Sequence, residues 1–243
     1  MTNLCVYMPL TWPTISTKVF RSFLDMTGPD VQEELAKKDI KLKFMIHDKF
    51  PIDLNRNEAF DLSLTNKYEA KFIMCCDADQ VFRKDTILKL LDVLEENPDA
   101  GAATGIYFRK KHPYTCVVGK YSPWSKDLEN KRAALMEYGF IAGDGQQTLF
   151  YKPLQYFDVT QRVHAFGMGC ILIRSEIIKQ LDRPYFKYIN SHSLGGDLTI
   201  GGATEDMWFC SQLYQKGIKV LCDPKVHVGH VTEKVIYGNE HED

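Results

Sequence analysis

Residues 72–81 read Phe-Ile-Met-Cys-Cys-Asp-Ala-Asp-Gln-Val, an apolar run that ends at two carboxylates, Asp77 and Asp79. Such a run is typical of a strand that is buried on both faces of a sheet. The two aspartates should then emerge at the carboxyl end of the strand, where open α/β sheets have their ligand crevice. Hard oxygen donors at that edge suit Mg²⁺ or Mn²⁺ carrying a diphosphate, although Asp also ends strands in ordinary turns.

Apolar strands alternate with amphipathic helices on both sides of this stretch. The pattern predicts further strands at residues 3–8, 41–47, 100–108, 170–174 and 218–222. Helices are expected before residue 28 and over residues 30–38, 56–66, 85–97 and 204–216, the last closed by Gly217. This alternation predicts an α/β fold with a mixed, mainly parallel central sheet flanked by helices.

Composition narrows the class of protein. The chain has 243 residues, of which 44% are hydrophobic, enough to bury a large core as one domain. A net charge of −2 provides no general attraction for nucleic acid or an anionic membrane. No segment has the pattern of a targeting leader or a transmembrane anchor, so we expect a soluble, cytoplasmic protein. The seven cysteines form no CxxC pair, which favours reduced core thiols over a zinc site.

Three later segments carry polar side chains of interest. A glycine turn that includes Gly169 precedes the strand at 170–174, and it would let a ligand approach the backbone or serve the turn alone. Glu205 and Asp206 open a helix after a glycine-rich stretch, where they either favour the helix dipole or face a cleft. His227 and His230 follow the last strand, and an imidazole there would complete a metal site begun by the aspartates.

Residues 109–161 differ from the rest because they show no clean period. They combine aromatic side chains with a cluster of basic ones that includes Lys110. The segment is either a solvated excursion or a surface that binds an anionic or sugar polymer.

Four short motifs occur together in the order and spacing of a known family. They are Arg56-Asn57, Asp77-Ala78-Asp79, Thr204-Glu205-Asp206 and the Val-Gly-His-Val of residues 228–231. They resemble an Arg-Asn pair, a DxD motif, an acceptor-side Glu-Asp motif and a metal-binding Val-Gly-His segment. From residue 4 to about residue 234 the chain therefore resembles a nucleotide-sugar glycosyltransferase of the GT-A (Rossmann-like) fold. That class includes the family-two enzymes and the polypeptide N-acetylgalactosaminyltransferases.

The resemblance implies a metal-dependent hexosyltransferase-type enzyme that moves a sugar from a nucleotide-diphosphate sugar, most simply a UDP-sugar, to an acceptor hydroxyl. Asp77, Asp79 and His230 would hold Mn²⁺ or Mg²⁺, which offsets charge on the departing diphosphate. Arg56 would face the phosphates, since its fork of donors suits bidentate contact.

The resemblance also places the donor against one set of residues, namely Pro9, Leu10, Thr11, Asp48, Arg56, Asp77, Ala78 and Gly169. Asp48 stands where the family often reads the base. The chain departs from the family pattern at two points. Residues 9–12 read Pro-Leu-Thr-Trp in place of Pro-Thr-Tyr-Asn, and residues 47–50 read His-Asp-Lys-Phe in place of Asp-Asp-Gly-Ser.

Asp206, with Glu205 beside it, is the candidate catalytic carboxylate. As general base it would take the proton of the acceptor hydroxyl during attack opposite the leaving diphosphate, which implies inversion. Retention is the alternative, because the Val-Gly-His likeness points partly to retaining members. In a single domain of residues 1–243, residues 1–108 would form the nucleotide-binding half and residues 109–243 the acceptor-side half.

Two other functions remain open. One is a nucleotidyltransferase, which would be expected to carry a glycine-rich basic loop after its first strand. The other is a non-catalytic protein that binds a nucleotide-sugar or glycan. The acceptor is also open among a glycan, a lipid-linked sugar, a protein, a small molecule and a modified nucleic-acid base, and residues 109–161 are expected to determine it.

Overall fold

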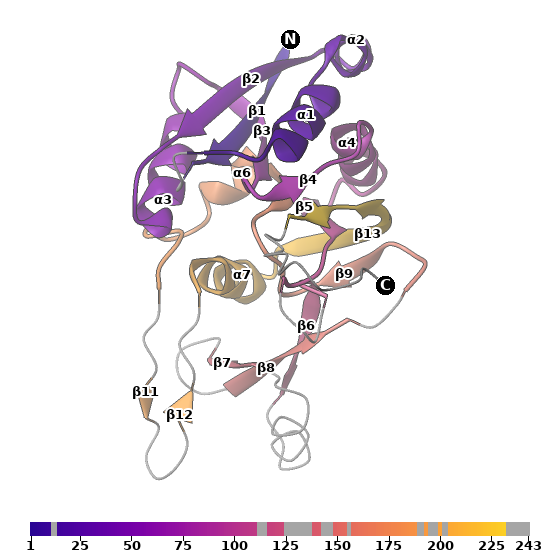
Figure 1. Cartoon of the computed structure of the whole chain (residues 1–243). Helices are drawn as coiled ribbons and strands as arrows, with labels where there is room; N and C mark the ends of the chain where they lie inside the picture. Colours follow the sequence, from indigo (N-terminus) through magenta and orange to yellow (C-terminus); the bar gives the residue numbers. More distant parts are fainter. Residues whose placement is uncertain are drawn as a thin grey trace, which may run out of the picture.

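The computed structural model describes residues 1–10, 14–110, 116–123, 138–141, 148–154, 157–188, 192–193, 199–200 and 204–231. Within them a seven-stranded sheet runs through the molecule, with helices on both of its faces (Figure 1). The strand order is β2 (Ile40–His47), β1 (Thr2–Pro9), β3 (Ala70–Cys76), β10 (Cys170–Arg174), β5 (Ala100–Ile106), β13 (Lys219–His227) and β9 (Gln161–Val163).

The sheet is mixed and mainly parallel, as the sequence predicts. β10 runs antiparallel to β3 and β5, and β9 runs antiparallel to β13, whereas the other neighbours are parallel. Five strands of this described sheet therefore point the same way, and their carboxyl ends share one edge.

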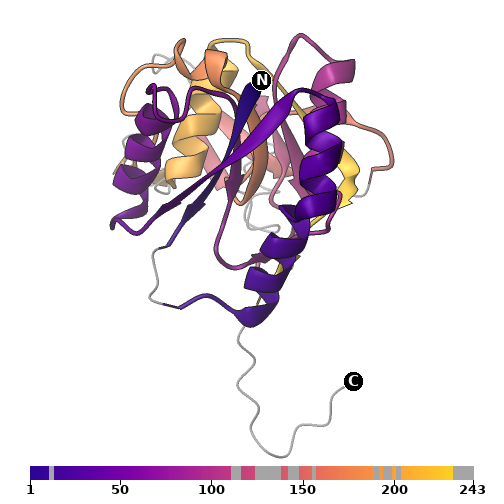
Figure 2. The ribbon, with the colours of Figure 1, turned by 90° about the horizontal axis from the view of Figure 1, so that it is seen from above.

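Helices bury both faces of the sheet. One face is covered by α1 (Thr17–Met26), α2 (Pro29–Lys37) and α4 (Thr86–Glu96). The other is covered by α3 (Ile52–Ser63), α6 (Ser175–Ile178) and α7 (Glu205–Gln215), so that the view from above shows helices on either side of the strands (Figure 2).

The apolar run of β3 follows from this double burial. Phe72 and Met74 pack into the core beneath α1, α2 and α4, while Ile73 and Cys75 pack into the core beneath α3, α6 and α7. Burying one such side chain contributes about 1.5–3 kcal/mol, so the stretch of β3 with two buried faces, residues 72–76, is apolar at every position, whereas Lys71 before it is exposed. All seven cysteines are free and buried, in agreement with the expectation of reduced core thiols.

Smaller elements lie at the margins of the sheet. A two-stranded ribbon joins β4 (Gln80–Val81) to β14 (Gly229–His230). Residues 109–161, whose sequence shows no clean period, contain a three-stranded sheet in the order β6 (Gly119–Pro123), β8 (Thr148–Pro153) and β7 (Tyr138–Ile141). A further pair consists of β11 (His192–Ser193) and β12 (Thr199–Ile200).

The last long strand continues beyond its expected end at residue 222. β13 breaks its register with β5 after Cys222 and pairs again where His227 meets Ile106. The sequence did not predict this extension because Asp223 and Pro224 are typical of a turn. Asp223 does accept a hydrogen bond from the backbone N–H of Lys225 at 2.9 Å. The extension carries the chain on to His230.

Candidate active site

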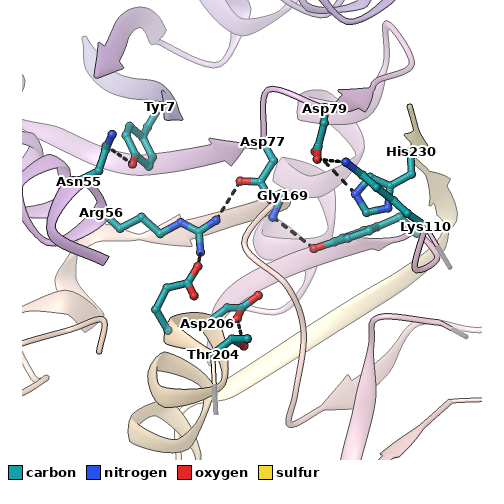
Figure 3. Close-up of polar contacts among 12 residues, drawn as sticks. Tyr7, Asn55, Arg56, Asp77, Asp79, Lys110, Gly169, Thr204, Asp206 and His230 are labelled. Carbon is teal, nitrogen blue, oxygen red and sulfur yellow. Dashed lines mark hydrogen bonds and ion pairs between the residues drawn. The ribbon is translucent and has the colours of Figure 1, made fainter. Parts of the chain in front are cut away.

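Asp77 and Asp79 lie directly after β3, at the edge where the carboxyl ends of the parallel strands meet (Figure 3). The backbone N–H of Asp77 donates to the carbonyl of Gly169 at 3.1 Å, which ties the motif to the turn before β10. The structure therefore places both aspartates where the apolar run predicts them.

The ribbon of β4 and β14 brings His230 to Asp79. His230 pairs with Gln80, and the N–H of Val231 donates to the carbonyl of Asp79 at 2.9 Å. As a result Nε2 of His230 lies 3.6 Å from Oδ1 of Asp79. His227 lies at the end of β13 and takes no part in this contact.

A backbone carbonyl orients the His230 ring. Nδ1 of His230 lies 2.6 Å from the carbonyl oxygen of Phe108, and the ring stands edge-on to that of Tyr107. With Nδ1 donating to that carbonyl, a neutral His230 presents the lone pair of Nε2 on the side of Asp79, the arrangement common for metal-bound imidazoles. Burial lowers the pKa of His230, but the nearby carboxylate of Asp79 and the hydrogen bond to the carbonyl of Phe108 outweigh burial and raise it overall.

Asp79 and His230 together fit a divalent cation. Oδ1 of Asp79 is buried and has no hydrogen-bond partner, and it faces an imidazole nitrogen. A carboxylate oxygen and an imidazole nitrogen are both suitable donors for Mn²⁺. Burial raises the pKa of Asp79, but contacts with His230 and Lys110 outweigh burial and lower it to about 2, so the carboxylate is ionised.

Asp77, the third expected ligand, turns its carboxylate to Arg56 instead. Its Oδ1 lies 2.9 Å from a terminal nitrogen of Arg56. In the described part of the chain no three His, Cys, Asp or Glu side chains are grouped as a metal site would require. The structure thus brings two of the three expected ligands together and leaves the third on the same edge with a different partner.

Arg56 joins the strand edge to helix α7. It projects from α3, is buried, and makes a second ion pair of 2.6 Å with Glu205 (Figure 3). The family resemblance implies that Arg56 faces phosphates, but both of its terminal nitrogens are held by carboxylates. Its role in this structure is to fix the positions of Asp77 and Glu205.

Glu205 and Asp206 begin α7, with Thr204 as the N-cap residue. Glu205 is buried against Arg56, and burial raises its pKa although the guanidinium opposes that rise. Asp206 is half-buried and accepts a hydrogen bond from the hydroxyl of Thr204. Of these two acids, Asp206 is therefore the more accessible to solvent.

The expected donor residues gather at the ends of neighbouring strands. Pro9 ends β1, Leu10 directly follows it, and Asp48 directly follows β2. The N–H of Leu10 donates to the carbonyl of His47 at 2.8 Å. Ala78 lies between the two aspartates and is half-buried. Thr11 lies outside the described residues.

Comparison with known proteins identifies the family. The family model described as glycosyl transferase family 2 matches residues 28–182. The chain belongs to glycosyl transferase family 2. It is a glycosyltransferase, so family membership decides against the nucleotidyltransferase alternative.

Solved structures show the same GT-A fold as this glycosyltransferase. A197 from STIV has a TM-score of 0.55 at 16% sequence identity, and the match covers 96% of this chain and 87% of the A197 chain. GalNAc-T7, solved with UDP, GalNAc and Mn²⁺, has a TM-score of 0.51 at 13% identity, covering 99% of this chain and 45% of its own. No curated protein matches the chain in sequence. Among the described residues, no helix is long and apolar enough to cross a bilayer.

In the glycosyltransferase, the side chain of Gln80 packs against Gly169. A Cβ atom at residue 169 would lie 2.1 Å from Nε2 of Gln80, which is fully buried and has no hydrogen-bond partner. The missing side chain at this position thus makes room for the residue that follows the DxD motif.

Sequence reasoning missed several residues of the site. Asn55 accepts from the hydroxyl of Tyr7 at 2.6 Å and donates to the carbonyls that flank Asp48, at 2.9 Å and 2.8 Å. Tyr188 packs by Glu205, and Lys110 contacts Asp79. Lys110 belongs to the basic cluster within residues 109–161, so composition gave a signal for it, whereas no sequence pattern indicated Asn55 or Tyr188.

A cavity of about 390 Å³ lies beside Phe108, at the edge of the sheet that carries Asp79 and His230. Apolar side chains dominate its lining, among them Ile106, Phe108 and Phe157, with Asp158 and Lys225 also present. Phe108 is shared between this cavity and the site, because its carbonyl oxygen contacts His230.

Proposed function

We propose that this glycosyltransferase moves a sugar from a UDP-sugar to an acceptor hydroxyl, with a divalent cation and with inversion. One observation carries the proposal. Arg56 bridges Asp77, at the end of the strand with the DxD motif, and Glu205, the neighbour of Asp206. The two ion pairs thereby hold the proposed donor site near Asp77 and the candidate base Asp206 in one rigid arrangement. Attack of an acceptor hydroxyl on a bound sugar requires such fixed positions.

The donor would lie across the ends of β1, β2 and β3. Asp48 is exposed beside Leu10, and its backbone neighbours are fixed by Asn55, so it is placed to contact the base of the nucleotide. Asp79 and His230 would hold the cation, which when bound offsets negative charge on the departing diphosphate. The UDP and Mn²⁺ in the GalNAc-T7 structure support this choice of donor and ion.

Asp206 would act as the general base. Its carboxylate stands at the accessible end of α7, and it would take the proton of the acceptor hydroxyl as that oxygen attacks the anomeric carbon. Glu205 cannot share the task while it is buried and paired with Arg56. A single base opposite the leaving group implies inversion, and retention remains the alternative.

The whole chain would act as one catalytic domain. Residues 1–108 would supply the nucleotide side and residues 109–243 the acceptor side. The acceptor, whether glycan, lipid-linked sugar, protein, small molecule or modified nucleic-acid base, would be selected by residues 109–161.

Asp206→Asn tests the catalytic role against the binding role. We expect calorimetry to show UDP binding that requires Mn²⁺ in both wild type and variant. Donor turnover in Asp206→Asn should fall by about 10²–10⁴-fold, the usual contribution of a general base. NMR of the first-formed product should show an inverted anomeric centre.

Asp182→Asn is the matched control, since it changes an exposed carboxylate remote from the site and should leave turnover unchanged. Full turnover in Asp206→Asn would refute the role of the base. Metal-dependent UDP binding by the wild type without turnover of any donor would indicate a non-catalytic binding protein.

A further inference from the structure

Lys110 forms an ion pair with Asp79, the carboxylate that the proposed metal ion would need. Its ammonium group makes an ion pair with Oδ2 of Asp79, while Oδ1 of the same carboxylate faces Nε2 of His230 (Figure 3). Both oxygens of Asp79 are therefore engaged by or directed at nitrogen atoms. A cation that binds Oδ2 must displace the ammonium group.

The position of Lys110 allows such a displacement. Its side chain is 40% exposed and that of Asp79 is 43% exposed, so the pair lies at the surface of the edge. An exposed ion pair is weak, and the flexible stem of Lys lets its charge move by several ångströms. Lys110 follows Phe108, whose carbonyl holds His230, so one short segment after β5 positions both partners of Asp79.

The charge of the site gives a displaced Lys110 a new partner. Asp77, Asp79, Glu205 and Asp206 all lie at this edge. Burial raises the pKa of Asp77 although Arg56 opposes that rise, and the negative charges of Asp79 and Asp206 raise it further. The terminal nitrogens of Arg56 are already taken by Asp77 and Glu205. A diphosphate that enters beside these carboxylates meets like charge, and a mobile ammonium group would relieve it.

Resting on the proposed function, we propose that Lys110 is an exchangeable cation of the donor site. In the metal-free protein it neutralises Asp79. When a divalent ion takes Asp79, the ammonium group moves to the diphosphate of the donor. Lys110 thus weakens the binding of metal alone and strengthens the binding of nucleotide once metal is present.

Lys110→Met separates these two effects because they have opposite signs. Calorimetry with Mn²⁺ alone should show tighter binding than wild type by about fivefold, the factor that corresponds to an exposed ion pair of about 1 kcal/mol. UDP titrated into protein saturated with Mn²⁺ should bind about fivefold more weakly, for loss of a contact of similar strength. A residue that serves folding alone would not raise one affinity and lower the other.

Two further variants complete the test. Lys110→Arg keeps the charge and should remain near wild type in both titrations. Lys84→Met removes another exposed lysine that pairs with a carboxylate, Asp30, away from the site, and should change neither affinity. Circular dichroism checks that each variant is folded.

The outcomes distinguish this role from the proposed function. If wild type binds Mn²⁺ and UDP while Lys110→Met matches it in either titration, the role of Lys110 is refuted and the proposed function stands. If Lys110→Met binds Mn²⁺ alone more weakly than wild type, the role is likewise refuted. If wild type binds neither Mn²⁺ nor UDP, both proposals fail.

Discussion

Arg56 is a buried cation between two carboxylates, and such an arrangement has a large cost if it is left incomplete. Asp77 and Glu205 come from segments far apart in the chain, and both lose water on folding. Removing one partner of a buried ion pair typically costs about 3–5 kcal/mol, because the remaining charge is uncompensated. Here one substitution would leave two carboxylates without their cation.

We therefore predict that Arg56→Met lowers the free energy of unfolding by about 3–5 kcal/mol at pH 8. The loss should be smaller at pH 5. Burial raises the pKa of Glu205, and Arg56 opposes that rise, so without Arg56 the folded-state pKa rises further. A carboxyl group with a raised folded-state pKa stabilises the protein below its unfolded pKa, and this stability is lost as pH rises.

Urea denaturation at the two pH values measures the difference. Lys37→Met serves as control, because Lys37 pairs with Glu34 on the surface and its loss should leave the unfolding midpoint unchanged. A variant that is equally destabilised at both pH values, or not at all, would contradict the buried-charge argument.

The two-residue strands β4 and β14 decide where His230 lies. Gln80 of β4 packs against Gly169 and pairs with His230 in β14, so the turn before β10, the DxD motif and the imidazole form one packed unit. The relative position of Asp79 and His230 therefore depends on the close approach of the Gln80 side chain to Gly169.

Gly169→Ala should disturb this unit. The added Cβ would lie 2.1 Å from Nε2 and 2.5 Å from Cδ of Gln80, in a fully buried position. Overpacking of this kind costs about 1–3 kcal/mol, and the displaced ribbon should also bind Mn²⁺ more weakly. Thermal unfolding and calorimetry measure the two effects.

Gly229→Ala is the matched control in the same ribbon, since its Cβ would make an ordinary contact of 3.4 Å with Val81. We expect it to resemble wild type in both measurements. Near-equal behaviour of the two alanine variants would show that packing at Gly169 does not position His230.

The sequence predicts the long elements well because their signals are local. The unbroken apolar run of β3 reflects burial on two faces, and Gly217, with a φ of +69°, ends α7 where a left-handed residue is needed. β4 and β14 were beyond prediction, because two residues carry no period and the pairing needs a partner distant in the chain. The pairing of Arg56 with Asp77 and of Lys110 with Asp79 could not be predicted either, because each pair joins residues distant in the chain. The sequence indicated Arg56, Asp77, Asp79 and Lys110 only as separate residues of interest.

At the scale of the whole molecule, the two expected halves share one sheet. β10 and β13 come from residues 109–243, yet β10 lies between β3 and β5, and β13 lies beside β5. Without the second half, β5 would lose both of its neighbours. The central cores beneath both helical layers would lose side chains such as Ile171 and Leu172.

We predict that the fragment of residues 1–108 does not fold alone, because an isolated β5 would expose two unpaired edges and buried apolar surface. Its near-ultraviolet circular dichroism should be featureless and its thermal transition broad, whereas the full chain should unfold in a single cooperative transition. Mixing it with a fragment of residues 109–243 should restore the near-ultraviolet signal, since β10 and β13 then supply the missing neighbours. Cooperative unfolding of the first fragment alone would show that the nucleotide side is an independent domain, and that the interleaved sheet is not what holds the two sides of the site together.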